Sequence, residues 1–106
     1  MNNIEKIPAI VQKEVIALMY PYIILDDETE ISHSHVIDKN GQNEIEVHFE
    51  RPNENGFDTA RCSLPSYCWV IREGFSDDEI KAFLHFLKSN EHLLFKYAAS
   101  GGIQVA

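Results

Sequence analysis

Residues 31–64 read ISHSHVIDKNGQNEIEVHFERPNENGFDTARCSL, and this stretch decides the fold of the chain. It contains two Asn-Gly pairs, Asn40-Gly41 and Asn55-Gly56, between segments in which apolar and polar residues alternate. Asn-Gly is the strongest short signal for a tight β-hairpin, because a type I′ turn needs positive φ at both central residues. The stretch therefore predicts three neighbouring antiparallel strands, at Ile31–Ile37, Glu44–Arg51 and Phe57–Leu64.

The two turns also predict which residues face each other. If each loop has two residues, the numbers of paired residues sum to 81 in the first hairpin and to 111 in the second. Because side chains alternate across a strand, each residue then keeps one face of the sheet. The apolar face contains Val36, Ile45, Val47, Phe49, Ala60, Cys62 and Leu64. The polar face contains His33, His35, Glu44, Glu46, His48, Glu50, Arg61 and Ser63.

Two further strands and an N-terminal helix flank this core stretch. Tyr22–Leu25 and Tyr67–Arg72 are rich in β-forming residues, which predicts an antiparallel meander of four or five strands. Turn residues Pro65-Ser66 place Trp69 and Ile71 on the apolar face and Cys68 on the polar face. Before the sheet, apolar residues recur near the helical period, which predicts a helix that Pro21 ends. Those residues are Ile7, Ile10, Val11, Val15, Leu18 and Met19.

The C-terminal third has the pattern of a helix. Ser76 and Glu79 form a capping box before an apolar repeat, and Gly101-Gly102 is a typical helix end. Ser89-Asn90 predicts a break near Asn90, followed by a second helical piece. Ile103–Val105 predicts a short edge strand. The fold class is therefore α+β, with helices packed on the Val47 face, where apolar surface needs covering.

Length and composition are those of one small globular domain. The chain has 106 residues, of which 44% are hydrophobic and 25% charged, so residues 1–106 are expected to form a single domain. No apolar stretch reaches the length of a membrane span, and the N-terminus lacks the pattern of a signal peptide. A cytoplasmic location is therefore expected.

The net charge of −8 restricts the class of partner. It results from 17 acidic and 9 basic residues, and nucleic acid is a poor partner for such a surface. A basic protein is a better partner, whereas acidity can also serve solubility alone. A homodimer is left open. Two cysteines are too few for a disulfide scaffold.

One group of side chains on the polar face has the composition of a metal site. In the predicted register His33, His35, His48 and Glu46 form a two-by-two patch, and zinc accepts imidazole nitrogen and carboxylate oxygen. The metal hypothesis is zinc or another divalent ion held by the histidines, with Glu46 as fourth ligand or general base. The alternative is an ordinary solvated polar face without a cofactor, on which histidine and glutamate form a charge-stabilised pair.

No complete catalytic set accompanies this patch. Ser63 and Cys68 would lie in a row with His48, but Cys68 is two strands away and nothing supplies an oxyanion hole. His85 and His92 are expected on the surface of the C-terminal helix. Whether the chain is an enzyme is therefore left open, with the balance against catalysis.

The segment Ile31-Ser32-His33-Ser34-His35-Val36, together with Trp69 and Gly74-Phe75-Ser76 before the helix, resembles a class of small uncharacterised bacterial domains. Its members contain an H-x-H-V strand, a short sheet and a C-terminal helix, and some are encoded beside toxin–antitoxin or mobile-element genes. The resemblance covers roughly residues 31–95. The chain departs from that class in its long N-terminal helix and in having no proline directly before His33. The resemblance implies a bacterial or phage origin and carries over no activity or site.

Two function classes follow from these observations. The first is a non-enzymatic interaction protein of the antitoxin, immunity or inhibitor type, which presents an acidic surface to a basic partner. The second is a divalent-metal-binding or metal-dependent protein that uses the histidine face. Charge and the incomplete catalytic set favour the first.

Overall fold

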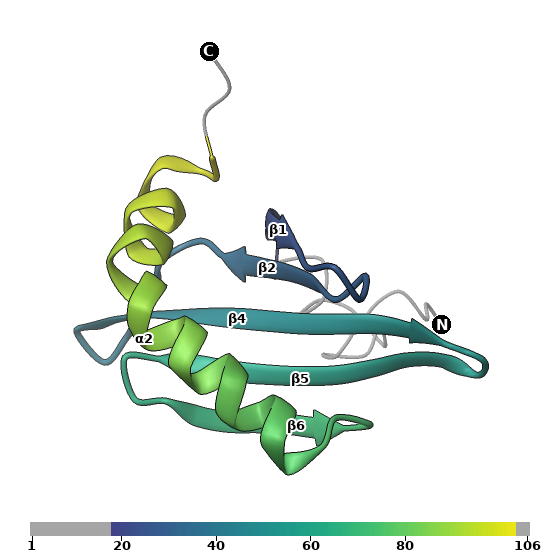
Figure 1. Ribbon diagram of the computed structural model, residues 1–106. Coiled ribbons are helices and arrows are strands. Elements are labelled where there is room, and N and C mark those ends of the chain that lie inside the picture. The colour runs from purple at the N-terminus through teal and green to yellow at the C-terminus, as the bar shows by residue number, and fades with distance from the viewer. Residues whose placement is uncertain (1–17, 104–106) are drawn as a thin grey trace, which may run out of the picture.

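The computed structural model describes residues 18–103, which form a curved antiparallel sheet with one long helix across it (Figure 1). The elements are β1 (Met19–Ile24), β2 (Glu30–Ser34), β3 (Ile37–Lys39), β4 (Gln42–Asn53), β5 (Gly56–Leu64), β6 (Cys68–Glu73) and α2 (Asp77–Ser100). Within the described part, the α+β class and the antiparallel sheet are confirmed. No helix among the described residues combines the length and apolar character that crossing a membrane requires.

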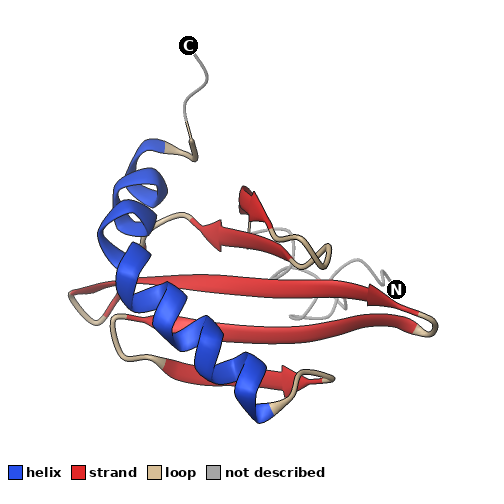
Figure 2. Cartoon of the chain, viewed as in Figure 1, coloured by secondary structure: helices blue, strands red, loops and turns tan. Residues whose placement is uncertain are grey.

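The strands follow one another across the sheet in the order β1-β2-β4-β5-β6, and the short β3 pairs with the start of β4. The helix α2 lies diagonally over one face of this sheet (Figure 2). We call the face under α2 the core face and the opposite face the open face, since no described element covers it. The predicted meander is thus correct, with six strands in place of four or five.

The predicted N-terminal helix lies almost entirely outside the described residues. Of its expected apolar residues only Leu18 and Met19 are described: Leu18 is in no helix, and Met19 begins β1, which continues through Pro21 to Ile24. Pro21 is compatible with this position because β1 is an edge strand. An extra residue, Tyr22, interrupts the pairing of β1 with β2 and forms a bulge.

The hairpin between β4 and β5 has a register two residues away from the predicted one. Asn53 pairs with Gly56 and Ile45 pairs with Leu64, so Glu54 and Asn55 form the loop and paired numbers sum to 109. The side chain of Asn53 accepts a hydrogen bond from the Asn55 N–H at 2.7 Å, which closes the turn one residue earlier than an Asn-Gly loop would. Because the displacement is even, every residue keeps its predicted face.

The last strand is also bulged. Cys62 pairs with Trp69 and Arg61 pairs with Ile71, so Val70 is an extra residue on β6. Trp69 therefore faces the core as predicted, whereas the prediction for Ile71 is wrong, because the bulge turns it to the open face with Arg61. Cys68 pairs with Ser63 on the open face, as expected.

The core forms between the sheet and α2. Phe49 stacks on Phe83 with ring centroids 4.2 Å apart, and Phe86 and Trp69 flank it at 6.4 and 6.0 Å. The buried apolar residues are Ile31, Ile45, Val47, Phe49, Ala60, Cys62, Leu64, Ile80, Phe83, Leu87, Leu94 and Ala98. Six of the seven residues predicted for the apolar face belong to this set, and Val36 packs against it half-buried.

The helix begins where the sequence predicts, at the capping box of Ser76 and Glu79, and Gly101 ends it in the left-handed conformation. The predicted break near Asn90 is wrong, because α2 is continuous from Asp77 to Ser100. The Asn90 amide donates to the Phe86 carbonyl at 2.9 Å and accepts from the Tyr22 hydroxyl at 2.7 Å. Ile103 is not in a strand, and the rest of the predicted Ile103–Val105 strand lies outside the described residues.

Arg51 connects four parts of the fold at the far end of β4. Its guanidinium contacts Asp58 on β5 at 2.8 Å, Glu79 on α2 at 2.5 Å and Asp27 in the β1–β2 loop at 3.2 Å. It also lies 4.6 Å from the centre of the Phe75 ring. We call these residues the Arg51 cluster, and it fixes the start of α2 on the sheet.

Candidate functional site

His33, the first residue of the predicted metal site, lies on the core face. β2 pairs with β4 so that His33 is opposite Val47 and Ile31 is opposite Phe49, which places both in the interior. The His33 ring is fully buried beside the rings of Tyr20 and Tyr22, at 5.7 and 6.2 Å, and its Nδ1 lies 2.9 Å from the Ser34 carbonyl. The predicted pairing of His33 with His48 is therefore wrong.

The cause is a one-residue bulge between β2 and β3. The pair Ile37–Glu44 follows the predicted register, but His33 pairs with Val47, so three residues on one strand face two on the other. The Ser34 hydroxyl replaces the missing ladder bond, because it accepts from the Glu46 N–H at 2.9 Å and donates to the His35 carbonyl at 2.7 Å. A displacement by an odd number of residues moves every side chain of β2 to the opposite face of the sheet.

A signal for this bulge exists in the sequence. The uninterrupted register would expose Ile31 on the polar face, although it is a β-branched apolar residue within a strand. Ile31 and Val36 are five positions apart, which is an odd number, so a regular strand cannot bury both. The bulge allows Ile31 to be completely buried and Val36 to be half-buried.

His48 and Glu46 are the two predicted ligands that the structure brings together. The His48 Nε2 lies 2.8 Å from the Glu46 carboxylate on the open face, and the imidazole side chain is only 10% exposed. Burial lowers the pKa of His48, although Glu46 acts in the opposite direction, so the neutral imidazole is favoured. Because a carboxylate only accepts, Nε2 carries the proton and Nδ1 has the lone pair.

The four residues do not converge on one point. His35 is half-buried within the bulge, and His33 lies on the other side of the sheet from His48. Among residues 18–103, no group of three or more His, Cys, Asp or Glu side chains is arranged to hold a metal ion. Zinc or another divalent metal at His48 and Glu46 stays a prediction, with two of its four ligands in contact.

The two cysteines lie on opposite sides of the sheet, as predicted. Cys62 is buried, and burial raises the pKa of its thiol to about 12, so it is an inert core residue. Cys68 is exposed beside Ser63. His85 and His92 are exposed on α2, as expected.

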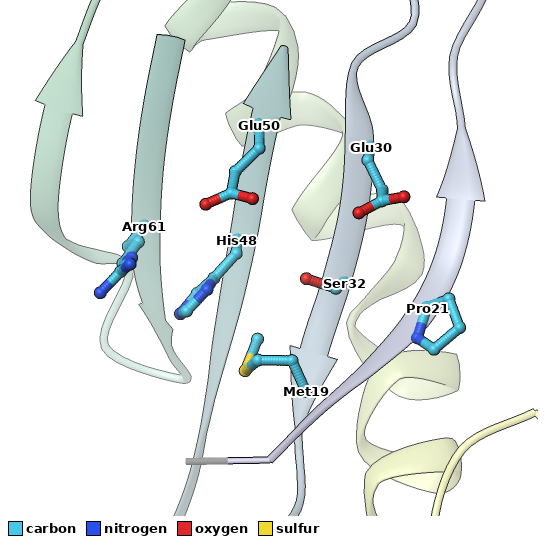
Figure 3. Close-up of a pocket in the computed structure, with 7 residues that line it drawn as sticks. All are labelled: Met19, Pro21, Glu30, Ser32, His48, Glu50 and Arg61. Carbon is cyan, nitrogen blue, oxygen red and sulfur yellow. The ribbon is translucent and has the colours of Figure 1, made fainter. Parts of the chain in front are cut away.

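The open face is hollowed by a cleft of about 530 Å³ that four adjacent strands line (Figure 3). Its lining residues are Met19 and Pro21 from β1, Glu30 and Ser32 from β2, His48 and Glu50 from β4, and Arg61 from β5. The sequence predicted that His48, Glu50 and Arg61 share this face. It did not predict the four lining residues from β1 and β2. The register of β2 against β4 brings Glu30 and Ser32 to this face.

The cleft contains charged side chains that form no ion pair within the described residues. Glu30 is directly opposite Glu50, and like charges in that position destabilise a sheet. Neither carboxylate forms an ion pair within residues 18–103, and Arg61 does not form one either. The Arg61 Nε is buried without a hydrogen-bond partner. The arrangement can therefore bind a polar or charged group, and it contains no nucleophile with a base in hydrogen-bond contact.

No family model, curated protein or solved structure matches this chain, so the geometry of its own residues is the basis for a function.

Proposed function

We propose that the chain is a non-enzymatic protein-interaction module of the antitoxin, immunity or inhibitor type, which presents the open face of its sheet to a basic partner. The main support is the set of glutamates on that face, Glu30, Glu44, Glu46 and Glu50. Within the described residues only Glu46 contacts a basic side chain, the imidazole of His48, and burial lowers the pKa of that imidazole. The net charge of −8 adds a long-range attraction for a basic surface.

A partner on this face would contact a rigid surface. The open-face glutamates on β4 belong to the central strand of the sheet, which is hydrogen-bonded on both sides to its neighbours. Rigid strands position side chains more precisely than loops do, which lowers the entropy lost on binding. Opposite charges across such an interface accelerate association and make it dependent on salt.

The experiment is an affinity capture from the native host with three forms of the full chain. The first is the wild type and the second is Glu30→Gln/Glu44→Gln/Glu50→Gln. The third, Asp26→Asn/Glu54→Gln, neutralises exposed carboxylates in the β1–β2 and β4–β5 loops. A basic protein should be captured by the wild type and the third form, lost with the second, and should re-form a stoichiometric complex from purified components. Equal capture by all three forms, or no such protein, contradicts the proposal.

The alternative is a divalent-metal-binding or metal-dependent protein. The contact between His48 and Glu46 supports it, because both are ordinary zinc ligands. The interaction module is preferred, because the described residues bring only this pair of the four predicted ligands together, whereas four glutamates lie on the open face.

A further inference from the structure

The cleft on the open face has two chemically different ends. At one end Glu30 and Glu50 are directly opposite each other on adjacent strands, where a cation would relieve the repulsion between their charges. At the other end Arg61 lies opposite His48. Met19 and Pro21 supply apolar lining on the side of the cleft away from Glu30 and Glu50, because they pair with Ser34 and Ser32 (Figure 3).

Two further groups in the cleft have a nitrogen without a hydrogen-bond partner among the described residues. His48 is nine-tenths buried, its Nε2 is occupied by Glu46, and no described residue donates to its Nδ1. The Nε of Arg61 is sealed from solvent without a partner, so the guanidinium charge has to be met through its terminal nitrogens. The cleft therefore offers places for a cation, for an N–H donor and for an anion.

We infer that this cleft binds the C-terminal residue of a partner chain when that residue is lysine or arginine, with the side-chain cation between Glu30 and Glu50 and the α-carboxylate on Arg61. This inference rests on the proposed function and names the chemistry that the interaction module recognises. A C-terminal basic residue carries both charges on one short frame, whereas an internal lysine carries only the cation.

The spacing of the strands fits a ligand of this size. Glu50 and Arg61 are diagonal neighbours on β4 and β5, which places their backbones roughly 7–8 Å apart. This separation is comparable to the length of an extended lysine side chain. The methylene groups of that side chain can pack on Met19, whose side chain extends toward His48 (Figure 3), while the ammonium reaches the carboxylates.

The test uses small probes on the full chain and follows backbone amide shifts by NMR. The probe Nα-acetyl-L-lysine imitates a C-terminal lysine. Nα-acetyl-L-lysinamide lacks the carboxylate, and Nα-acetyl-L-norleucine lacks the cation. The first probe should shift the amides of the cleft residues saturably. Each of the other two should bind at least about tenfold more weakly, because each loses one charge-assisted contact.

Protein variants make the test specific to the cleft. Glu30→Gln/Glu50→Gln and Arg61→Gln should each weaken binding of Nα-acetyl-L-lysine at least about tenfold, whereas Glu54→Gln, an exposed control in the β4–β5 loop, should not. Circular dichroism and thermal unfolding verify that each variant folds. Glu30→Gln/Glu50→Gln should not lose stability, because it removes a repulsion between opposed charges.

Equal binding of the acid and the amide, or no saturable shift with Nα-acetyl-L-lysine, overturns the inference. If a basic protein is still captured through the open face in that case, the proposed function survives and only the C-terminal recognition fails. If free L-lysine binds more tightly than its Nα-acetyl form, the cleft is a site for a free amino acid and the inference is wrong.

Discussion

The bulge between β2 and β3 depends on one hydroxyl group, and Ser34→Ala tests that dependence. Ser34 is 2% exposed, and its Oγ accepts from the Glu46 N–H and donates to the His35 carbonyl. The substitution keeps the Cβ and removes both hydrogen bonds. The Glu46 N–H and the His35 carbonyl then lose their hydrogen-bond partners in a half-buried environment.

The expected loss follows from those two groups. A buried donor or acceptor without a partner costs about 1–3 kcal/mol, and partial access of water reduces the cost, so the total should be about 2 kcal/mol. For a domain of this size that loss lowers Tm by roughly 10 °C.

Urea unfolding followed by the fluorescence of Trp69, the single tryptophan, measures the free energy of unfolding. Trp69 packs 6.0 Å from Phe49, so its emission reports the core. The matched control is Ser32→Ala on the same strand, since the Ser32 hydroxyl lines the open cleft. That control should change stability by less than about 0.5 kcal/mol. If Ser34→Ala is as stable as the control, the account of the bulge is wrong.

Three further predictions concern charged groups. Arg51→Met should cost about 1–3 kcal/mol in urea unfolding, because it leaves the Asp58 carboxylate, which is 15% exposed, without its cation. Arg72→Met, whose partner Asp77 is 91% exposed, should cost less than about 0.5 kcal/mol. Hydrogen bonds from Arg51 hold the pKa of Glu79 below its ordinary value, so this stabilisation is present above the unfolded pKa and is lost as pH falls through the folded one. The decrease in unfolding free energy from about pH 6 to about pH 3 should therefore be smaller in Arg51→Met than in the wild type; an unchanged slope would contradict the assignment. Any zinc that elemental analysis finds in tag-free protein should be lost in His48→Ala and kept in His85→Ala, an exposed control on α2; the reverse pattern would exclude His48 as a ligand.

The two hairpin predictions had errors of different kinds. Whether the displacement of the register is an even or an odd number of residues explains the consequence of each error. In the β4–β5 hairpin the loop is Glu54-Asn55, two residues from the expected register, so Val47 and Cys62 still share the core face. In the first hairpin Asn40 and Gly41 have positive φ, of 55° and 84°, and the β3–β4 pairing is as predicted. In β2, on the other side of the bulge from β3, the pairing with β4 is displaced by one residue, which moves the β2 side chains to the face opposite to the predicted one.

Local patterns therefore predicted the strands and the start of the helix. Long-range contacts determined the continuity of α2 at Asn90 and the residues that line the cleft. The capping box at Ser76 is a local signal, and the helix begins there. Asn90 has a poor helix propensity, but its hydrogen bond to Tyr22 on β1, a residue 68 positions away, is invisible in the sequence. The cleft was missed for the same reason, because Met19 and Glu30 reach His48 only through the β1–β2 and β2–β4 registers.

The bulges at Tyr22 on β1 and at Val70 on β6 have a consequence for how this protein can assemble. Both margins of the sheet have an interrupted row of backbone donors and acceptors, and Pro21 removes one donor from β1 altogether. Polymerisation by strand addition, the common hazard of small β-rich proteins, is thereby opposed at both ends. Growth into fibrils should need prior unfolding of an edge strand.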